Sequence, residues 1–253
     1  MNIEFKNVSC GYGNKNIVSD LDVLIENGEA VCILGPNGIG KTTIFKAILQ
    51  CCDIQNGNIL IDGIDLGTMN ISEMAKCFAY VPQAKNYSYE FTVFDVILMG
   101  RAVHIEKFKM PTDKDYKEVN NILKQLGLTD YKEKKYSELS GGEQQIVLIA
   151  RAIVQDAKMI LLDEPASNLD YKNQKKLIDT IRWLKQNEKG ILMVSHNPEH
   201  AIMCCERTLL MFQNGNHKYG YTREVINEEN LSKMYGVSIK SAKKEDRVMF
   251  YIE

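Results

Sequence analysis

Short runs of apolar residues recur along the chain and predict the strands of a buried parallel sheet. Apolar and polar positions do not alternate within these runs, which is typical of strands covered by helices on both faces. Candidate functional residues follow each run closely, as expected at the carboxyl edge of an open α/β sheet. The four predicted strands are Val31–Leu34, Phe78–Val81, Met159–Leu162 and Ile191–Val194.

Antiparallel strands are predicted beside this core. The Asp62-Gly63 pair between two apolar segments is a strong hairpin signal, and Asn214-Gly215 is a second one. A loop is expected at Gly11–Asn14. The tail is expected to hold a short helix before its last two strands. These predicted segments are Ile3–Val8, Leu21–Ile25, Asn58–Leu60, Ile64–Leu66, Thr208–Phe212, the helix Glu228–Tyr235, Val237–Lys240 and Val248–Ile252.

The middle of the chain is predicted to be helical. Thr92 with Asp95, and Thr112 with Asp115, have the spacing of a capping box at a helix N-terminus. Apolar residues at helical spacing follow Thr112, and Gly127 is placed to end that helix.

The order of these elements predicts one α/β domain over residues 1–253. Residues 1–83 and 159–253 are expected to form a core with a mostly parallel sheet and an antiparallel β subdomain. Residues 84–158 are expected to form an inserted helical subdomain. The sequence contains no internal repeat, low-complexity tract or interdomain linker.

Charge and terminal composition limit the partners. The formal net charge of −2 gives no global basic field for nucleic acid or an anionic membrane. The N-terminus lacks the basic patch and apolar stretch of a signal peptide, and no apolar run approaches the ~20 residues of a membrane span. Any contact with a membrane protein is therefore expected to be made by docking.

Cysteine usage indicates a reducing compartment. The chain has 7 cysteines, none in a CxxC pair and none at metal-ligand spacing from a histidine. An odd count without a disulfide framework predicts reduced thiols and a cytoplasmic location.

The first chemical motif follows Val31–Leu34, where residues 35–42 read GPNGIGKT. Its glycines let backbone N–H groups converge on phosphate oxygens, and the positive end of the following helix faces the anion. The Lys41 ammonium suits the β- and γ-phosphates, and the Thr42 hydroxyl suits Mg²⁺. The strand before and the amphipathic helix after favour a P-loop over a chance match. The predicted ATP-binding residues here are Gly35, Pro36, Asn37, Gly38, Ile39, Gly40, Lys41, Thr42 and Thr43.

Three further segments end at the same predicted edge. Asp163 is suited to hold the metal and Glu164 to act as general base for the attacking water, although two acidic residues could instead cap a helix. His196 could bond the γ-phosphate and hold that water, or be a structural histidine. The Gln83 amide could meet Mg²⁺ or water, or cap a turn.

A second glycine-rich helix start lies at Ser140, Gly141 and Gly142. Its N–H groups and serine hydroxyl suit an anion, but no lysine accompanies them and the chain has one P-loop. A plain N-cap is one interpretation. The other is that this helix start binds the γ-phosphate of ATP held by a partner.

Together these residues resemble the nucleotide-binding subunits of ABC (ATP-binding cassette) transporters over nearly the whole chain. The resemblance implies a head-to-tail dimer that encloses two ATP molecules, with Mg²⁺ at Thr42, Gln83 and Asp163. It implies that residues Leu139–Glu143 (LSGGE) form the signature, in which Glu143 replaces the commoner Gln and is expected to matter little. The other implied roles are adenine stacking by Tyr12, the Q-loop at Gln83, the D-loop at Asp170 and the switch histidine at His196.

A narrower resemblance covers Val93–Asp115, which is similar to importer ATPases for iron–siderophore, haem, cobalamin and some oxyanions. It implies docking on membrane permease subunits at the inner face of the membrane, with an extracellular solute-binding protein as an indirect partner. The solute expected from this resemblance is an iron–siderophore, haem, cobalamin or a related metal-containing compound, and the particular solute is not predicted. The alternatives are a soluble ABC ATPase of the iron–sulfur assembly type and an exporter ATPase, and the motif residues could be ordinary loop residues. The residues that carry this similarity are Gly100, Arg101, His104, Phe108 and Pro111.

Overall fold

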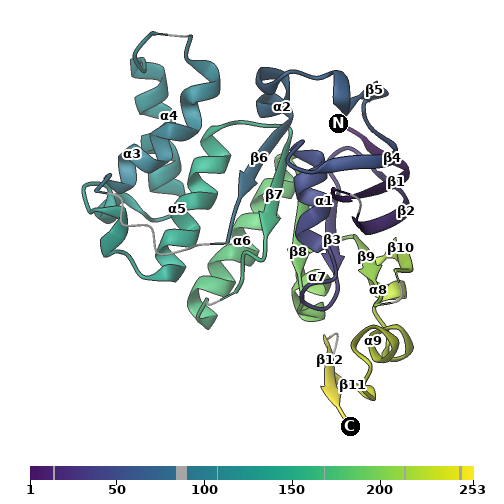
Figure 1. The fold of residues 1–253 in the computed structure, drawn as a ribbon. Coiled ribbons are helices and arrows are strands. Elements are labelled where there is room, and N and C mark those ends of the chain that lie inside the picture. Colours follow the sequence, from purple (N-terminus) through teal and green to yellow (C-terminus); the bar gives the residue numbers. More distant parts are fainter. Residues whose placement is uncertain (14, 84–89, 107, 168, 214, 245–246) are drawn as a thin grey trace. The chain divides into compact units, whose positions relative to one another are not determined.

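The chain forms two compact units in the computed structural model (Figure 1). The first unit joins Met1–Met69 to Gly190–Glu253, and the second is Asn70–Lys189. The structure describes all residues except 14, 84–89, 107, 168, 214 and 245–246. The described part of the predicted helical subdomain, residues 90–158, lies within the second unit.

The first unit contains a parallel core. Strand β3 (Ala30–Leu34) pairs in parallel with β8 (Gly190–Ser195) and with β9 (Arg207–Met211), and every residue of β3 and β8 is buried. Strand β10 (His217–Tyr221) pairs antiparallel with β9. The two predicted strands of this unit, at Val31–Leu34 and Ile191–Val194, are confirmed.

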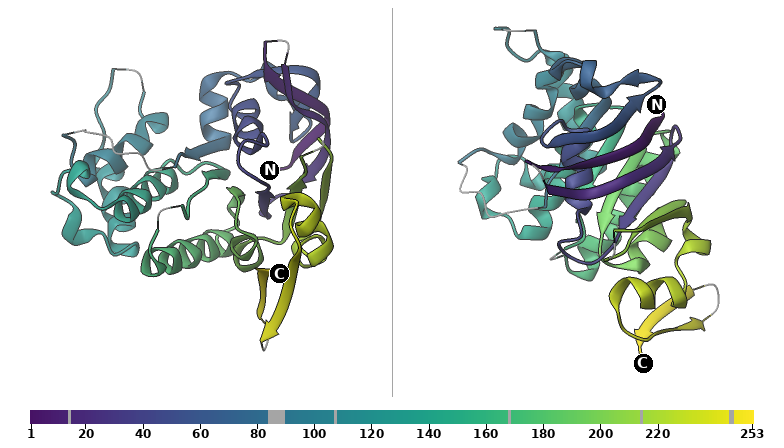
Figure 2. Two further views of the ribbon diagram at one scale, coloured as in Figure 1. Left: turned by 60° about the horizontal axis from the view of Figure 1, so that its bottom comes forward. Right: turned by 45° about the vertical axis from the view of Figure 1, so that its right-hand side comes forward.

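An antiparallel sheet in the same unit has the order β2-β1-β4-β5. Apolar side chains of this sheet, such as Phe5 and Val23, meet Ile33 and Leu209 of the parallel strands in one core. Figure 2 shows the long β1 and β2 ribbons. The strands are β1 (Ile3–Tyr12), β2 (Lys15–Ile25), β4 (Asp53–Ile61) and β5 (Ile64–Asp65).

The loop predicted at Gly11–Asn14 is shorter in the structure, because β1 and β2 continue to a Tyr12–Lys15 pair. Register shifts interrupt the regular pairing along β1, so the residue pattern of the sequence did not reveal this continuation. Gly11 permits it, since a Cβ there would lie 2.0 Å from the carbonyl oxygen of Lys15.

Both hairpins are present. Asp62 and Gly63 have φ angles of 50° and 83°, the left-handed pair of a tight two-residue turn between β4 and β5. In the second predicted turn, Gly215 is left-handed at 82°, while Asn214 lies outside the described residues. The paired strands β9 and β10 flank that turn.

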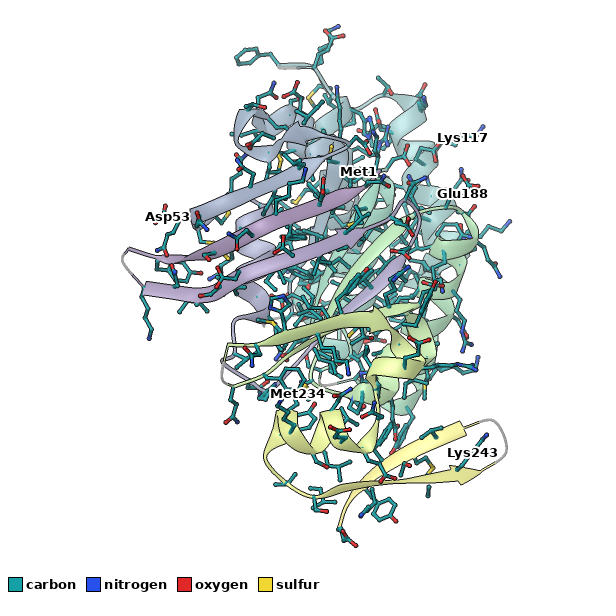
Figure 3. All side chains as sticks on the ribbon, turned by 90° about the vertical axis from the view of Figure 1, so that its right-hand side faces the viewer. Met1, Asp53, Lys117, Glu188, Met234 and Lys243 are labelled. Atoms are coloured by element: carbon teal, nitrogen blue, oxygen red, sulfur yellow. The ribbon has the colours of Figure 1, made fainter. Side chains whose placement is uncertain are left out.

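The remaining elements of the first unit include the predicted tail. Helix α9 has the predicted bounds, and Figure 3 shows it, marked by Met234, beside the hairpin that carries Lys243. The first of the two last strands lies a few residues later than predicted, whereas the second begins one residue before its predicted start and ends at the predicted residue. The elements are α1 (Lys41–Ile48), α7 (Pro198–Cys204), α8 (Thr222–Val225), α9 (Glu228–Tyr235), β11 (Ile239–Lys244) and β12 (Arg247–Ile252).

The second unit holds a parallel pair of strands and most of the helices. Strand β6 (Phe78–Val81) pairs with β7 (Met159–Asp163), which confirms the other two predicted strands. Both predicted capping boxes are present, at Thr92 and Thr112. The helices are α2 (Ile71–Cys77), α3 (Val93–Leu98), α4 (Asp113–Gln125), α5 (Gly141–Val154) and α6 (Tyr171–Gln186), with a 3-10 segment at Met99–His104.

Among the residues that the structure describes, no helix combines the length and the apolar character needed to cross a bilayer.

Candidate functional site

The phosphate cradle joins β3 to α1 in the first unit. Gly38 and Gly40 have φ angles of 79° and 110°, which favour glycine because a Cβ strains that backbone. A Cβ on Gly40 would also lie 2.8 Å from Cγ2 of Ile17, so Ile17 of strand β2 packs closely against the loop. The loop shape is therefore fixed by glycine conformation and by packing.

Lys41 lies against this loop rather than in solvent. Its side chain is buried, and Nζ donates to the carbonyl oxygens of Gly35 and Pro36 at 2.9 Å and 3.0 Å. No described side chain caps α1, so the positive end of the helix dipole faces the loop without a competing acceptor from a cap. Thr42, the next residue, is half-buried at the same helix start.

Tyr12 ends β1 in the same unit and is 47% exposed. The Nζ atom of Lys46, on α1, lies 5.3 Å from the centre of its ring. The contact places the ring beside the helix that begins at the cradle. A half-exposed ring in this position has a face that a nucleotide base can cover.

The acidic pair lies in the second unit, at the end of β7. Asp163 is buried, and its carboxylate accepts a hydrogen bond of 3.0 Å from the hydroxyl of Tyr80. The Gln83 amide donates to Ser167 Oγ at 2.9 Å, and this hydroxyl donates to the carbonyl of Glu164 at 2.7 Å. The structure thus links the predicted Gln83 and Glu164 through a serine that sequence reasoning missed.

Glu164 has a backbone strain that the sequence did not reveal. Its φ angle is 46°, in the left-handed region where a non-glycine residue is uncommon. Such strain costs about 1–3 kcal/mol and persists where the surroundings impose it, often at functional sites. The Ser167 bond to the Glu164 carbonyl is one of the contacts that hold this turn.

His196 follows β8 in the first unit and is exposed. Its backbone carbonyl accepts a hydrogen bond from the hydroxyl of Tyr235 on α9. Burial raises the pKa of Tyr235 to about 12, so this hydroxyl remains a donor at neutral pH. Burial and the charge of His196 lower the pKa of His200, one turn further on. The local sequence around His196 gives no signal for the distant Tyr235.

The predicted signature forms a complete capping box at the start of α5. Ser140 N and Oγ both donate to Oε2 of Glu143, at 2.9 Å and 2.7 Å. Glu143 N in turn donates to Ser140 Oγ at 3.4 Å. Hydrogen bonding by Ser140 lowers the pKa of Glu143, and hydrogen bonding to Glu143 raises the pKa of Tyr131. The spacing S-x-x-E is a sequence signal for this contact.

Asp170, the predicted D-loop residue, caps helix α6. Its carboxylate accepts a hydrogen bond of 2.8 Å from Asn173 N. Asn173 also lies against Gly142, where a Cβ would come within 2.5 Å of its side-chain nitrogen. The starts of α5 and α6 therefore pack closely within the second unit.

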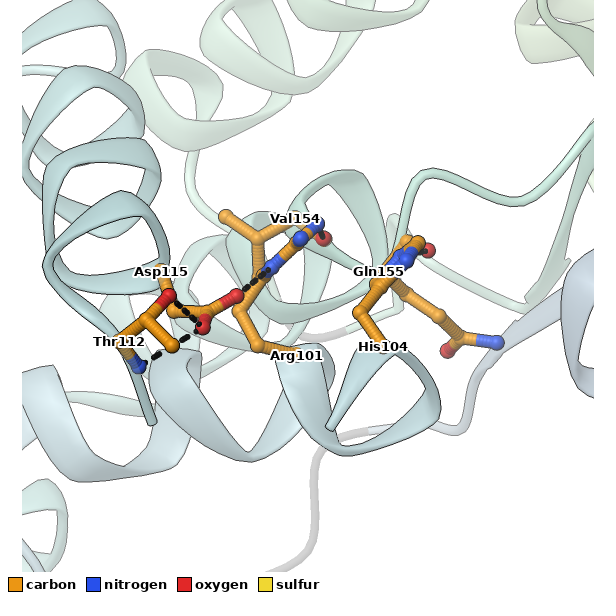
Figure 4. Close-up of polar contacts among 6 residues, drawn as sticks. All are labelled: Arg101, His104, Thr112, Asp115, Val154 and Gln155. Carbon is orange, nitrogen blue, oxygen red and sulfur yellow. Dashed lines mark hydrogen bonds and ion pairs between the residues drawn. The ribbon is translucent and has the colours of Figure 1, made fainter. Parts of the chain in front are cut away.

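The segment Val93–Asp115, called the importer-like segment below, contacts the C-terminal end of α5 (Figure 4). Arg101 Nη1 donates to the carbonyl of Val154 at 2.8 Å, and Nε forms an ion pair of 2.9 Å with Asp115. His104 Nε2 lies 2.9 Å from the carbonyl oxygen of Gln155. Arg101 and His104 therefore hold the 3-10 segment Met99–His104 against the end of α5.

The rest of this motif divides into packed and exposed residues. A Cβ on Gly100 would lie 2.2 Å from the carbonyl oxygen of Arg151, so a side chain there would push the segment away from α5. Phe108 is fully exposed, with a left-handed φ of 66°, and Pro111 is half-buried. One part of the motif therefore packs against α5, the helix that begins at the predicted signature, and the other part is an exposed loop.

The predicted site residues fall into two groups, each assembled within its own unit. The first unit carries the cradle, Tyr12 and His196, and the second carries Gln83, the acidic pair, the signature and Asp170. Binding of a nucleoside triphosphate at the cradle and activation of water by a carboxylate are both available to this chain. These features define an ATP-hydrolysing P-loop protein.

Comparison with known proteins identifies the family. The family model described as ABC transporter matches residues 18–167, more than half of the chain. The chain therefore belongs to the ABC transporter family, as an ATP-binding, ATP-hydrolysing subunit, and the resemblance seen in the sequence is confirmed.

Individual relatives extend over the whole chain. A probable iron chelatin transport ATP-binding protein of Helicobacter pylori is 33% identical over 99% of both chains. A manganese transport system ATP-binding protein of Synechocystis sp. is 32% identical over 93% of this chain and 90% of its own. A solved ABC transporter structure, described as of metal-chelate type and inward-facing, has a TM-score of 0.86 and 29% identity over 99% of this chain and 96% of that chain. These likenesses also confirm the predicted α/β fold class.

Proposed function

We propose that this chain is the ATPase subunit of an importer for iron chelates or related metal-containing solutes, working as a head-to-tail dimer. We infer the dimer because the same chain contains one cradle, with Lys41, and one lysine-free signature helix, with Ser140. One chain has a single P-loop, so the second anion-binding helix start suits ATP held by a second copy.

The roles of the site residues follow from their chemistry. The cradle residues, Lys41 above all, hold the phosphates, and Tyr12 stacks on the base. Mg²⁺ suits the donor set of Thr42, Gln83 and Asp163, which offers a hydroxyl, an amide and a carboxylate oxygen. When bound, this ion would neutralise charge on the phosphate oxygens.

Glu164 would accept the proton of the attacking water, and the strained backbone at this residue supports a functional role. His196 would bond the γ-phosphate, with its backbone held by Tyr235. Asp170 would hold the start of α6 beside the signature through Asn173.

The importer assignment rests on the segment Val93–Asp115 and on the relatives. Arg101 and His104 bind the last carbonyls of α5, so a partner that moves this segment also moves the helix that starts at Ser140. The relatives reported above are named as a probable iron chelatin transport protein and a manganese transport system protein, and the similar solved structure is described as a putative metal-chelate type ABC transporter. Permease subunits at the inner face of the membrane, fed by an extracellular solute-binding protein, are the partners that fit this role.

Affinity purification of the tagged chain from gently solubilised membranes tests the proposal. We expect a multi-spanning permease to co-purify. We also expect the complex, in vesicles, to move a ferric chelate towards the side that holds this subunit and ATP. Lys41→Ala should abolish uptake while leaving the complex assembled. Recovery of a soluble scaffold instead would support the iron–sulfur assembly alternative. Movement of the solute away from the side that contains ATP would instead support an exporter.

A further inference from the structure

The signature serine is restrained by its own helix. The Ser140 hydroxyl donates its proton to Glu143 at 2.7 Å, and the same carboxylate oxygen accepts the Ser140 N–H at 2.9 Å. A hydroxyl has a single proton, so Ser140 has none to offer a phosphate while this bond persists. Glu143 also adds a negative charge beside the place where an anion would approach.

Nearby groups favour the charged form of Glu143. Hydrogen bonding by Ser140 lowers its pKa most, and Tyr131 and Lys134 of the preceding segment lower it further. Glu143 is half-buried and carries its charge at neutral pH. The charged carboxylate therefore lies at the start of α5 while it accepts both Ser140 donors.

We propose that Glu143 is a positioning residue that restrains Ser140 and opposes closure of the ATP-bound dimer. This inference deepens the proposed function and rests on the signature acting on a partner's ATP. It replaces the expectation from the sequence that Glu143 matters little. It assigns to Glu143, in place of the commoner Gln, the role of raising the ATP concentration needed for closure.

Sedimentation of purified Glu164→Gln protein with Mg²⁺ and ATP measures the restraint directly, because slow hydrolysis preserves the closed state. Adding Glu143→Gln removes one like charge near the bound anion, so the dimer should tighten on the order of tenfold. Glu138→Gln is the matched control, since Glu138 is exposed, lies two residues before Ser140 and has the same charge, and it should change nothing. Circular dichroism and a thermal melt confirm that each variant is folded.

Ser140→Ala separates failure of this inference from failure of the proposed function. If Ser140→Ala weakens the dimer while Glu143→Gln leaves it unchanged or weaker, the restraint is wrong and the signature model stands. If neither substitution has an effect, the signature does not act on a partner's ATP, and both proposals fail.

Discussion

Asp115→Asn tests whether the importer-like segment is a structural clamp on the signature helix. The Asp115 carboxylate is buried, pairs with Arg101 at 2.9 Å, and accepts from Thr112 N and Oγ1 at 2.9 Å and 2.7 Å. Asparagine keeps the shape and removes the charge. The buried Arg101 guanidinium then loses its ion-pair partner while it still donates to Val154.

The expected loss of unfolding free energy is about 3 kcal/mol. Breaking a buried pair by removing one partner costs about 3–5 kcal/mol, and the asparagine oxygen retains part of the hydrogen bonding to Thr112. Asp113→Asn is the matched control, because Asp113 is exposed in the same first turn of α4. Only a helix-dipole contribution of about 0.3–1 kcal/mol is lost there.

Urea titration followed by tryptophan fluorescence is a suitable assay. Trp183 is the single tryptophan of the chain and lines the same cavity of about 460 Å³ as Arg101 and His104, within the second unit. Its emission therefore reports unfolding of the unit that contains the Arg101–Asp115 pair.

The pH dependence supplies a second check. Hydrogen bonds from Thr112, and then Arg101, lower the pKa of Asp115 from 3.8 to about 2 in the folded protein. Because the unfolded carboxyl binds its proton first, this stabilisation is full above about pH 4 and is lost as the pH falls towards 2. The gap between wild type and Asp115→Asn should narrow over that range. Equal stability of Asp115→Asn and Asp113→Asn at pH 7 would refute the clamp.

Three further predictions concern nucleotide use. Lys41→Ala removes the cradle ammonium, so ATP affinity and hydrolysis should both collapse with an unchanged thermal melt; normal turnover would contradict the P-loop assignment. Tyr12→Ala should weaken ATP binding by about 1–3 kcal/mol and Tyr12→Trp by much less, as titration calorimetry can show; equal effects would mean that the ring does not stack. Ser140→Arg should block hydrolysis but not binding, and mixing it with Lys41→Ala protein should restore part of the turnover; no recovery in any ratio contradicts action between chains or requires both sites to fire together.

The elements that the sequence predicted well are those with strong local signals. Non-alternating apolar runs identified β3, β6, β7 and β8 within one residue at each end, because burial on both faces leaves no polar position. Capping boxes at Thr92 and Thr112 and the Asp62-Gly63 turn were equally clear. Helix α9 was predicted with its observed bounds.

The features that were missed depend on pairing and contacts that no local residue pattern encodes. The extension of β1 and β2 to Tyr12 and Lys15 is made by cross-strand pairing with register shifts, which no local pattern encodes. In the same way, the Tyr235 bond to His196 joins residues 39 positions apart. The Arg101 contact with Val154 spans 53 positions, and only a family likeness pointed to this segment.

At the candidate site, residue identity was predictable and conformation was not. The motifs named Lys41, Asp163 and Glu164 because phosphate and metal chemistry restrict the residue types. The strained φ of Glu164 and the Ser167 bridge to Gln83 depend on the fold of the turn after β7. The contact between Ser140 and Glu143 was predictable from the S-x-x-E spacing, and its effect on the signature is our proposal.

The central claim is that ATP joins two copies of this chain, each cradle facing the other chain's signature. Light scattering of Glu164→Gln protein, with ATP, with ADP and without nucleotide, tests it most directly. The variant keeps Lys41, Thr42 and Asp163, and general-base loss should slow hydrolysis by about 10²–10⁴-fold, so bound ATP persists. A ligand that binds only the closed form shifts the equilibrium towards it. We predict a dimer with ATP and a monomer with ADP or no nucleotide, whereas a monomer under all three conditions would contradict the claim.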